Sequence, residues 1–263
     1  MDKSSLGNRM KRYESVSKNY LMRKQPVIIR LDGKAFHTFT RGFVKPFDLV
    51  LNYTMQGTMK YLCENIQGCV LGYTQSDEIT LVLCDYQKID TDAWFDYNVQ
   101  KMVSVAASMA TMKFNQIFAK EAQEFYIAND ECESDEIREK LESYEDVLER
   151  AARKGAVFDA RAFTDPIEEV NDCLLWRQQD ATRNSIQALA QSLYQHKEIQ
   201  GINVKALQDK MFTEKGINWN DLPTEQKRGS CCKKNDDGCW VMDYNIPIFS
   251  QAPNYVNSRI RFE

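Results

Sequence analysis

The stretch CVLGYTQSDEITLVL, residues 69–83, contains two apolar segments separated by a short polar one. Each apolar segment has the length and the β-branched residues of a strand, so the stretch predicts a β-hairpin. Its turn falls on Ser76, Asp77 and Glu78, where a tight hairpin more often carries Gly or Asn. Two adjacent carboxylates between segments that should be buried need a physical explanation.

The composition of the chain is that of a globular protein. Of its 263 residues, 43% are hydrophobic and 27% are charged, and this length allows one large domain or two small ones. No apolar run is long enough to span a membrane, and the polar N-terminus lacks the apolar segment of a secretory signal. The eight cysteines are scattered, as expected for reduced thiols. We therefore expect a cytoplasmic protein with no membrane partner.

Charge is unevenly distributed along the chain. The formal net charge is −4, but residues 1–50 carry eleven Lys or Arg against four Asp or Glu. Residues 121–150 carry twelve acidic residues against three basic ones. Such asymmetry indicates a nucleic-acid-binding face at the basic end and a solvated element at the acidic one. Two ordinary solvated surfaces are the alternative.

Hydrophobic periodicity predicts further elements on both sides of the hairpin. Residues 26–33, PVIIRLDG, form a compact apolar run between Pro and Gly and predict a buried strand. Apolar residues at helical spacing predict a helix after Pro46 and another over about 92–118. The remaining predicted elements are an exposed acidic helix over 134–155 that stops at Gly155, a strand over 156–163 and a long helix over 166–195.

The order of these elements predicts the fold class. With an acidic helical insertion over about 120–155 set aside, the order is strand, helix, strand, strand, helix, strand. This is the ferredoxin-like order (βαββαβ), which also forms the palm of nucleotide polymerases and cyclases. We expect an α+β fold: a single catalytic domain over 1–263, with a polymerase-like palm core over about 24–196 and a C-terminal helical extension over 197–263.

This topology brings three carboxylates to one end of the sheet. Asp32 ends the first strand, and Asp77 and Glu78 occupy the tip of the neighbouring hairpin. Like charges so close together destabilise a fold unless a positive charge lies among them. Mg²⁺ takes carboxylate and phosphate oxygens as ligands, and two such ions serve phosphoryl transfer. The alternative is that Asp32-Gly33 and Ser-Asp-Glu are ordinary turns.

At this point the motifs resemble those of a known family. RLDGKAFHTF (30–39), KPFD (45–48) and GYTQSDEITLVL (72–83) are similar to motifs of the tRNA(His) guanylyltransferase superfamily. The resemblance extends from about residue 6 to residue 240. Members add nucleotides to the 5′ end of RNA in the 3′-to-5′ direction. The resemblance implies a nucleotidyltransferase that uses ATP, GTP or other nucleoside triphosphates on tRNA, and a homotetramer.

The resemblance also implies the residues of the site. Asp32, the Gly33 carbonyl and Asp77 are expected to hold two Mg²⁺ ions, with Glu78 as the third catalytic carboxylate. The implied triphosphate cradle consists of Ser76 and the backbone amides of Gly33, Lys34, Ala35, Phe36 and His37. Further implied nucleotide contacts are the side chains of His37, Lys45, Asp48 and Lys101. Phe47 departs from the family pattern, in which an Asn precedes the Asp.

Two later motifs concern RNA. FDAR (158–161) resembles the family's FDGR, which makes Arg161 a candidate phosphate or RNA contact. WRQQDATRNSI (176–186) aligns with a block that continues as His-Ile-Asn-Asn in the eukaryotic guanylyltransferases. Residues 182–185 lack that His, as in the bacterial and archaeal guanylyltransferase-like proteins, and Arg183 and Asn184 are the implied RNA contacts. Ordinary ion pairs remain the alternative for both arginines.

The implied activity is template-dependent repair of 5′-truncated tRNA, in which base pairing selects the added nucleotide. Addition of an untemplated G to tRNA(His) at position −1 is the alternative within the same family. A non-catalytic RNA-binding module is a rival from another class, because the RRM shares the fold, and a nucleotide cyclase is an enzymatic rival. The cysteines of CCKKNDDGC (231–239) have the wrong spacing for a zinc site.

Overall fold

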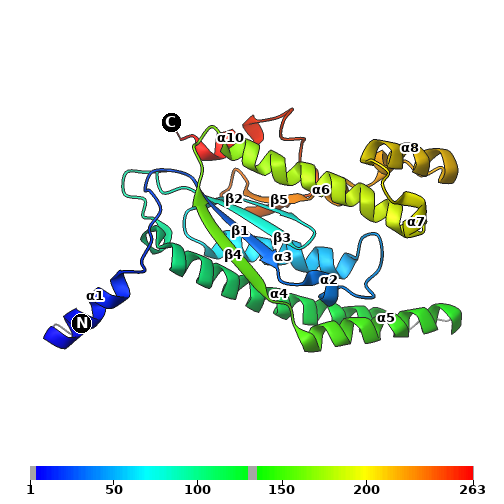
Figure 1. Ribbon diagram of the computed structural model, residues 1–263, viewed down its shortest axis with the longest axis horizontal. Coiled ribbons are helices and arrows are strands. Elements are labelled where there is room, and N and C mark those ends of the chain that lie inside the picture. Colours follow the sequence, from blue (N-terminus) through cyan, green and yellow to red (C-terminus); the bar gives the residue numbers. More distant parts are fainter. Residues whose placement is uncertain (1–3, 130–134, 263) are drawn as a thin grey trace.

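A computed structural model describes residues 4–129 and 135–262, and its centre is a six-stranded antiparallel sheet (Figure 1). The strands lie in the order β4-β1-β3-β2-β5-β6. Their bounds are β1 (Val27–Gly33), β2 (Cys69–Gln75), β3 (Glu78–Leu83), β4 (Phe158–Thr164), β5 (Ser230–Lys234) and β6 (Trp240–Asp243). The strand that ends at Asp32 and Gly33 therefore lies next to the hairpin, as the sequence predicts.

Helices cover both faces of the sheet. α3 (Leu49–Asn65) and α4 (Val99–Asn129) lie on one face, and α6 (Val170–Leu193) and α10 (Asn254–Ile260) lie on the other (Figure 1). The remaining helical segments are α1 (Ser5–Ser15), α2 (Phe36–Phe39), η1 (Trp94–Tyr97), α5 (Asp135–Lys154), α7 (His196–Ile199), α8 (Val204–Lys215), η2 (Trp219–Asp221) and α9 (Thr224–Arg228).

β1 is buried on both faces, which explains its continuous apolar sequence. Val27, Ile29 and Leu31 belong to the core under α3 and α4, whereas Ile28 belongs to the core under α6 and α10. Because side chains alternate along a strand, Arg30 and Asp32 share the face of Ile28. The charged residues of β1 are therefore on the α6 side of the sheet.

The loop after β1 is held by aromatic packing. Phe36 and Phe39 are buried and pack against each other and against Phe114, Phe118 and Phe158. The ring centroids of these contacting pairs are 5.1 to 5.6 Å apart. A Cβ on Gly33 would lie 2.2 Å from the Phe36 ring, so glycine is needed where the strand turns into α2. This packing fixes the loop at the end of β1.

The helix predicted over 92–118 begins later and extends further. Phe95 and Asp96 have left-handed φ values inside η1, which separates this turn from α4. α4 then continues to Asn129, so the predicted acidic insertion starts within it, and residues 130–134 of that insertion lie outside the described residues. α5 returns along α4 and ends at Gly155, as predicted.

Two predictions about the outlying segments are wrong in part. α5 is not simply an exposed helix, because Leu148 and Ala151 are buried in the core. The C-terminal extension is not only helical, because β5 and β6 form a hairpin that pairs with β2 and widens the sheet. The cysteines Cys231 and Cys232 lie buried in β5. Over residues 4–129 and 135–262, none of the helices has both the length and the apolar character needed to cross a membrane.

Candidate active site

The end of β1 and the turn of the β2–β3 hairpin meet at one place. Asp32 is directly opposite Glu78 in the β1–β3 register, so their side chains share a face of the sheet. The Gly33 N–H donates to the Asp77 carbonyl at 3.1 Å. Ser76 takes a left-handed φ of 50°, which closes the turn with Asp77. The pairing of the strands thus brings the three predicted catalytic residues to the same end of the sheet, as the topology requires.

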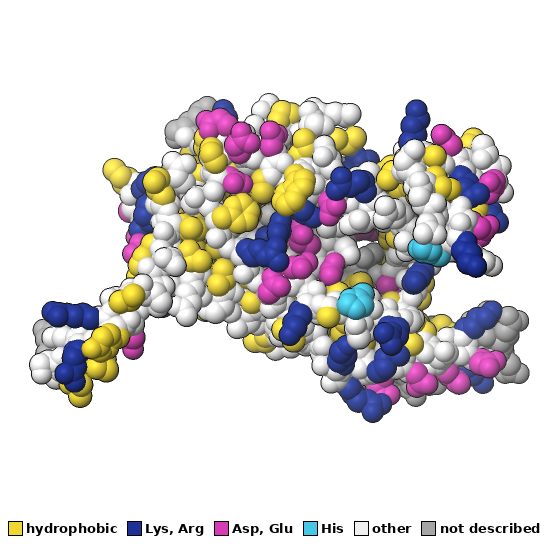
Figure 2. All heavy atoms as spheres, viewed as in Figure 1, with side chains coloured by type: hydrophobic (Ala, Val, Ile, Leu, Met, Phe, Trp, Pro, Cys, Tyr) yellow, Lys and Arg dark blue, Asp and Glu magenta, His cyan; other side chains and the backbone are white. Residues whose placement is uncertain are grey.

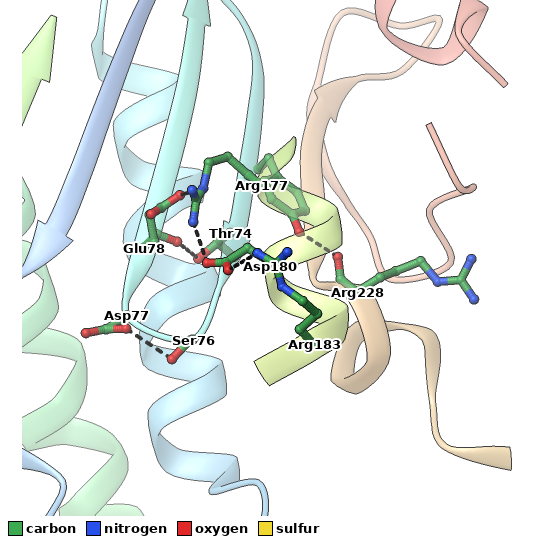
Figure 3. A network of polar contacts seen from close by, with 9 residues as sticks. Thr74, Ser76, Asp77, Glu78, Arg177, Asp180, Arg183 and Arg228 are labelled. Carbon is green, nitrogen blue, oxygen red and sulfur yellow. Dashed lines mark hydrogen bonds and ion pairs between the residues drawn. The ribbon is translucent and has the colours of Figure 1, made fainter. Parts of the chain in front are cut away.

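The two hairpin carboxylates point in different directions (Figure 3). Glu78 points toward α6, where its Oε1 accepts from Arg177 Nε at 2.8 Å. Arg177 is buried and also donates to Asp180 at 2.7 Å, and Arg183 donates to the other oxygen of Asp180 at 2.7 Å. Asp77 points away from this network and accepts from the Ser76 hydroxyl at 3.0 Å. The single cluster of three carboxylates predicted from the sequence is therefore not formed.

Arg177 supplies the positive charge next to Glu78, a charge that the sequence predicted would come from a metal ion. Burial raises the pKa of Glu78, although the positive charges of Arg177 and Arg30 act in the opposite direction. Burial also raises the pKa of Asp77; its own backbone and Ser76 act against this, and the negative charge of Asp32 adds to it. The ion pairs that described residues form at this end of the sheet engage Glu78, Asp159 and Asp180 and leave out Asp32 and Asp77.

This donor set fits a divalent cation held by two carboxylates rather than three. Within the described parts of the chain, no group of three His, Cys, Asp or Glu side chains is placed to hold a metal ion. Asp32 and Asp77 provide hard oxygen ligands on adjacent strands. Burial is the main cause of the raised pKa of Asp77, and the negative charge of Asp32 adds to it, so a bound cation would favour the ionised carboxylate. Carboxylate pairs completed by water and phosphate oxygens are usual for Mg²⁺.

A cavity of ≈ 390 Å³ opens beside Asp77, between α2 and the start of α3. Five of the predicted nucleotide contacts line it: Phe36, His37, Lys45, Asp48 and Ser76. A second cavity of ≈ 200 Å³ shares Pro46, Asp48, Leu51 and Ser76 with the first, and Asn184 of α6 lines it. The side chains of Lys34, His37 and Lys45 are exposed.

Fewer backbone amides are available for the predicted triphosphate cradle than the sequence suggests. The Gly33 amide is bonded to the Asp77 carbonyl, and the Lys34 amide donates to the Val157 carbonyl at 2.8 Å. Both amides belong to the sheet and are not available to a phosphate. The amides of Ala35, Phe36 and His37 lie at the start of α2, where backbone N–H groups have no acceptor within their own helix. The cradle is therefore reduced to these three.

Asp48 has a structural task. Its buried carboxylate caps α3 by accepting from the Leu51 amide at 2.9 Å, and it also accepts from the Val44 amide and the Tyr144 hydroxyl of α5. These contacts account for its burial without a nucleotide. Its predicted role in nucleotide binding stays a prediction.

The structure places Lys101 apart from the other predicted nucleotide contacts, and its role in nucleotide binding stays a prediction. It lies in the first turn of α4, over the Phe95 ring at 5.8 Å. The part of α4 that adjoins Gly33 is around Thr111, whose hydroxyl accepts from the amide of Phe158, the register partner of Gly33. Ten residues of helix separate the two positions, which is about 15 Å. The family motif identifies Lys101 by its place in the sequence and does not show its distance from Thr111 along α4.

The predicted RNA contacts lie on the α6 side of the sheet. Arg161 is opposite Arg30 in the β1–β4 register, and its exposed guanidinium is 3.7 Å from Asp159. Arg183 is exposed on α6 and paired with Asp180. Figure 2 shows acidic and basic side chains close together over the region of β1 and β4. Both arginines thus form the ordinary ion pairs of the alternative reading while their guanidinium groups stay accessible.

Four residues of this region have no role in the predictions from sequence. Arg177 and Asp180 lie in the quoted WRQQD motif, but their spacing on α6 gives no sign that they reach Glu78. Asp159 is directly opposite Asp32 in the β1–β4 register. Trp176 is half exposed and stacks with the guanidinium groups of Arg177 at 4.2 Å and Arg30 at 5.5 Å. The charge pattern of the α6 motif is the signal that could have indicated this network.

Comparison with known proteins defines the class. Residues 7–166 match the model of the tRNA(His) guanylyltransferase family. The chain belongs to this family of nucleotidyltransferases and is therefore an enzyme of that class. This membership rules against the non-catalytic RNA-binding module.

Particular relatives support the assignment over nearly the whole chain. A bacterial tRNA(His) guanylyltransferase-like protein in complex with ATP is 42% identical, with a TM-score of 0.83 over 98% of this chain and 100% of that one. Another, in complex with GTP, is 36% identical, with a TM-score of 0.75 and the same coverage. An uncharacterized protein of Acanthamoeba polyphaga mimivirus is 29% identical over 98% of this chain and 88% of its own length.

Proposed function

We propose that this protein repairs the 5′ ends of tRNA by template-dependent addition of nucleotides in the 3′-to-5′ direction, on a ferredoxin-like polymerase palm. One observation carries the proposal. Asp32 and Asp77 lie at adjacent strand ends, outside the ion pairs of the region, and Asp77 lines a cavity together with Lys45, His37 and Ser76. This arrangement suits a metal–triphosphate complex.

The proposed Mg²⁺ sites use Asp32, Asp77 and the Gly33 carbonyl, with Glu78 held in place by Arg177. The ions, when bound, supply the positive charge that phosphoryl transfer requires. Lys45 and His37 bind the triphosphate from the cavity wall, and the amides of Ala35, Phe36 and His37 with the Ser76 hydroxyl hold its oxygens. ATP, GTP and other nucleoside triphosphates are the proposed substrates, as ligands of the two bacterial relatives indicate.

On the RNA side, Arg161 and Arg183 bind backbone phosphates, and Asn184 borders the second cavity where the RNA end approaches the nucleotide. Such contacts recognise the shape and the charge of the RNA backbone and do not distinguish one tRNA from another. In the position of the eukaryotic His block, Ser185 is buried and accepts from Trp219 Nε1 at 3.0 Å. That part of α6 therefore anchors the C-terminal segment.

These features favour repair over the alternative, G addition at position −1 of tRNA(His). Repair needs no recognition of one tRNA because the opposing template base selects the nucleotide by pairing. We propose a cytoplasmic location because the proposed substrate is tRNA. The homotetramer implied by the family resemblance remains a prediction, to be checked by the mass of the protein in solution.

The test is a comparison of kcat/KM for a tRNA lacking its first 5′ nucleotide and for full-length tRNA(His), with the template base varied. We expect truncated tRNAs of several identities to be extended with the nucleotide complementary to the opposing base. A preference of about tenfold or more for untemplated G on full-length tRNA(His), about 1.4 kcal/mol in transition-state stabilisation, would overturn the repair assignment.

A further inference from the structure

Trp176 of α6 lies at the open part of the sheet face that carries Asp32. β4 is the edge strand there, and its residues Asp159 and Arg161 are exposed. The guanidinium of Arg30 in β1 lies 5.5 Å from the centre of the Trp176 ring, and the side chain of Trp176 is 50% exposed. Figure 2 shows hydrophobic, basic and acidic side chains next to each other over this part of the sheet. A large aromatic ring thus stays in solvent near the proposed active site.

The register of the sheet relates this ring to the site. Arg30 and Asp32 are two residues apart on β1, so their side chains share a face and are separated by about 7 Å along the strand. Arg161 is directly opposite Arg30 on β4. The indole of Trp176 therefore lies over the row of side chains next to Asp32, and this row also includes Arg161.

The exposed side of the indole is a preformed flat surface. The Arg177 guanidinium lies 4.2 Å from the centre of the ring and is buried, so this contact is on the side of the ring that faces the protein. The exposed fraction of the ring then belongs to its other side. Stacking with the guanidinium groups of Arg177 and Arg30 fixes the orientation of the indole.

A flat aromatic surface with arginines at its margin suits an unpaired RNA base. Proteins bind single-stranded nucleic acid by stacking bases on aromatic side chains and by placing basic residues along the phosphates. The exposed guanidinium groups of Arg161 and Arg183 lie on the same side of the sheet and complement the charge of an RNA backbone. Since the proposed site holds the RNA end near Asp32, a base of that end is the group that would meet the ring.

We propose that Trp176 stacks on the template base of a 5′-truncated tRNA, the unpaired base opposite the missing nucleotide, and holds it ready to pair with the incoming nucleotide. The assignment rests on the proposed repair function. Stacking tolerates every base, because each base has an aromatic face. One ring at this position would therefore serve tRNAs of several identities.

The test is a thermodynamic cycle between the ring and the base, measured by fluorescence anisotropy of labelled RNA without nucleoside triphosphates. One RNA is an acceptor-stem hairpin that lacks its first 5′ nucleotide, and the other has an abasic site at the opposing position. The variant Trp176→Leu keeps an apolar side chain but removes the aromatic surface. Its Kd for the first RNA should rise by about fivefold to a hundredfold, whereas its Kd for the abasic RNA should change by less than about twofold.

Two further variants control for the loss of a ring. Trp176→Phe keeps an aromatic surface and should retain most of the affinity for the first RNA. Phe212→Leu removes a ring that is 60% exposed on α8 and should leave both dissociation constants unchanged.

Equal weakening of both RNAs by Trp176→Leu would show that the ring acts only on the structure of the protein and would overturn the proposal. Unchanged binding of both RNAs would also overturn it and leave the ring to a protein partner. Because no nucleotide addition is measured, failure of the repair function is seen separately: a protein that shows the expected cycle but prefers untemplated G addition would lose the repair assignment and keep the stacking contact.

Discussion

Asp77 and Glu78 are adjacent in the sequence but have different surroundings. Glu78 is held by the buried guanidinium of Arg177, whereas Asp77 faces the cavity with only the Ser76 hydroxyl and its own backbone offsetting its charge. The hairpin therefore carries one carboxylate that pairs with Arg177 of the same chain and one that is available to a ligand. This division answers why two carboxylates occur between buried strands.

The variant Arg177→Met tests the ion pair between Arg177 and Glu78. The change keeps an unbranched side chain but leaves the buried Glu78 carboxylate without its partner, and breaking a buried pair in this way costs about 3–5 kcal/mol. Urea unfolding should show a loss of that size. The matched control is Arg183→Met, which removes the exposed partner of Asp180 and should cost less than about 1 kcal/mol. Equal losses in the two variants would contradict the assigned role of Arg177.

At the scale of elements, Asp48 connects α3, the loop before it and α5. Asp48→Ala removes the cap of α3, which costs about 0.5–2 kcal/mol, and leaves the Tyr144 hydroxyl without its acceptor, which costs about 1–3 kcal/mol more. Asp48→Asn keeps a capping oxygen for the Leu51 amide but places an NH2 donor where Oδ2 accepts from the Val44 amide and the Tyr144 hydroxyl, so its loss of stability should be smaller than that of Asp48→Ala but measurable. The measurement is the free energy of unfolding of each variant. An Asp48→Ala protein as stable as the unchanged one, but weak in nucleotide binding, would return Asp48 to the role predicted from sequence.

The elements that sequence predicted well are those with a clear apolar period. β1, the hairpin, α3 and α6 lie within a few residues of their predicted positions, because one buried face determines each pattern. The start of α4 was misplaced because the interruption at Phe95 and Asp96 comes from backbone conformation, which composition does not reveal. β5 was missed because its short run SCCKK, with two Lys at its end, has no strand period.

The site shows the same limit. Sequence placed Asp32, Asp77 and Glu78 on adjacent strands correctly because register follows from topology. It could not show that Glu78 would pair with Arg177, or that Lys101 would lie about 15 Å along α4 from Thr111, the part of the helix that adjoins Gly33. Both depend on how α6 and α4 pack across the sheet, which is tertiary information.

At the scale of the whole molecule, tRNA binding should be dominated by phosphate contacts of the basic side chains on the α6 side. The logarithm of the affinity should fall with the logarithm of salt concentration, by a slope of about 0.7 to 0.9 for each phosphate contacted. Arg161→Ala and Arg183→Ala should each reduce that slope by about one contact. Filter binding of tRNA from dilute to physiological salt provides the measurement, and an affinity that does not change with salt would exclude this mode.

The most direct test of the central claim is single-turnover nucleotide addition to a 5′-truncated tRNA by Asp32→Asn, Asp77→Asn and Asp159→Asn. All three remove one carboxylate charge from the same end of the sheet, but only the first two remove a proposed cation ligand. Loss of a ligand worth several kcal/mol predicts rates lower by roughly a thousandfold or more for Asp32→Asn and Asp77→Asn. Asp159→Asn should keep its rate within about tenfold. Near-normal addition by Asp32→Asn or Asp77→Asn would contradict the account.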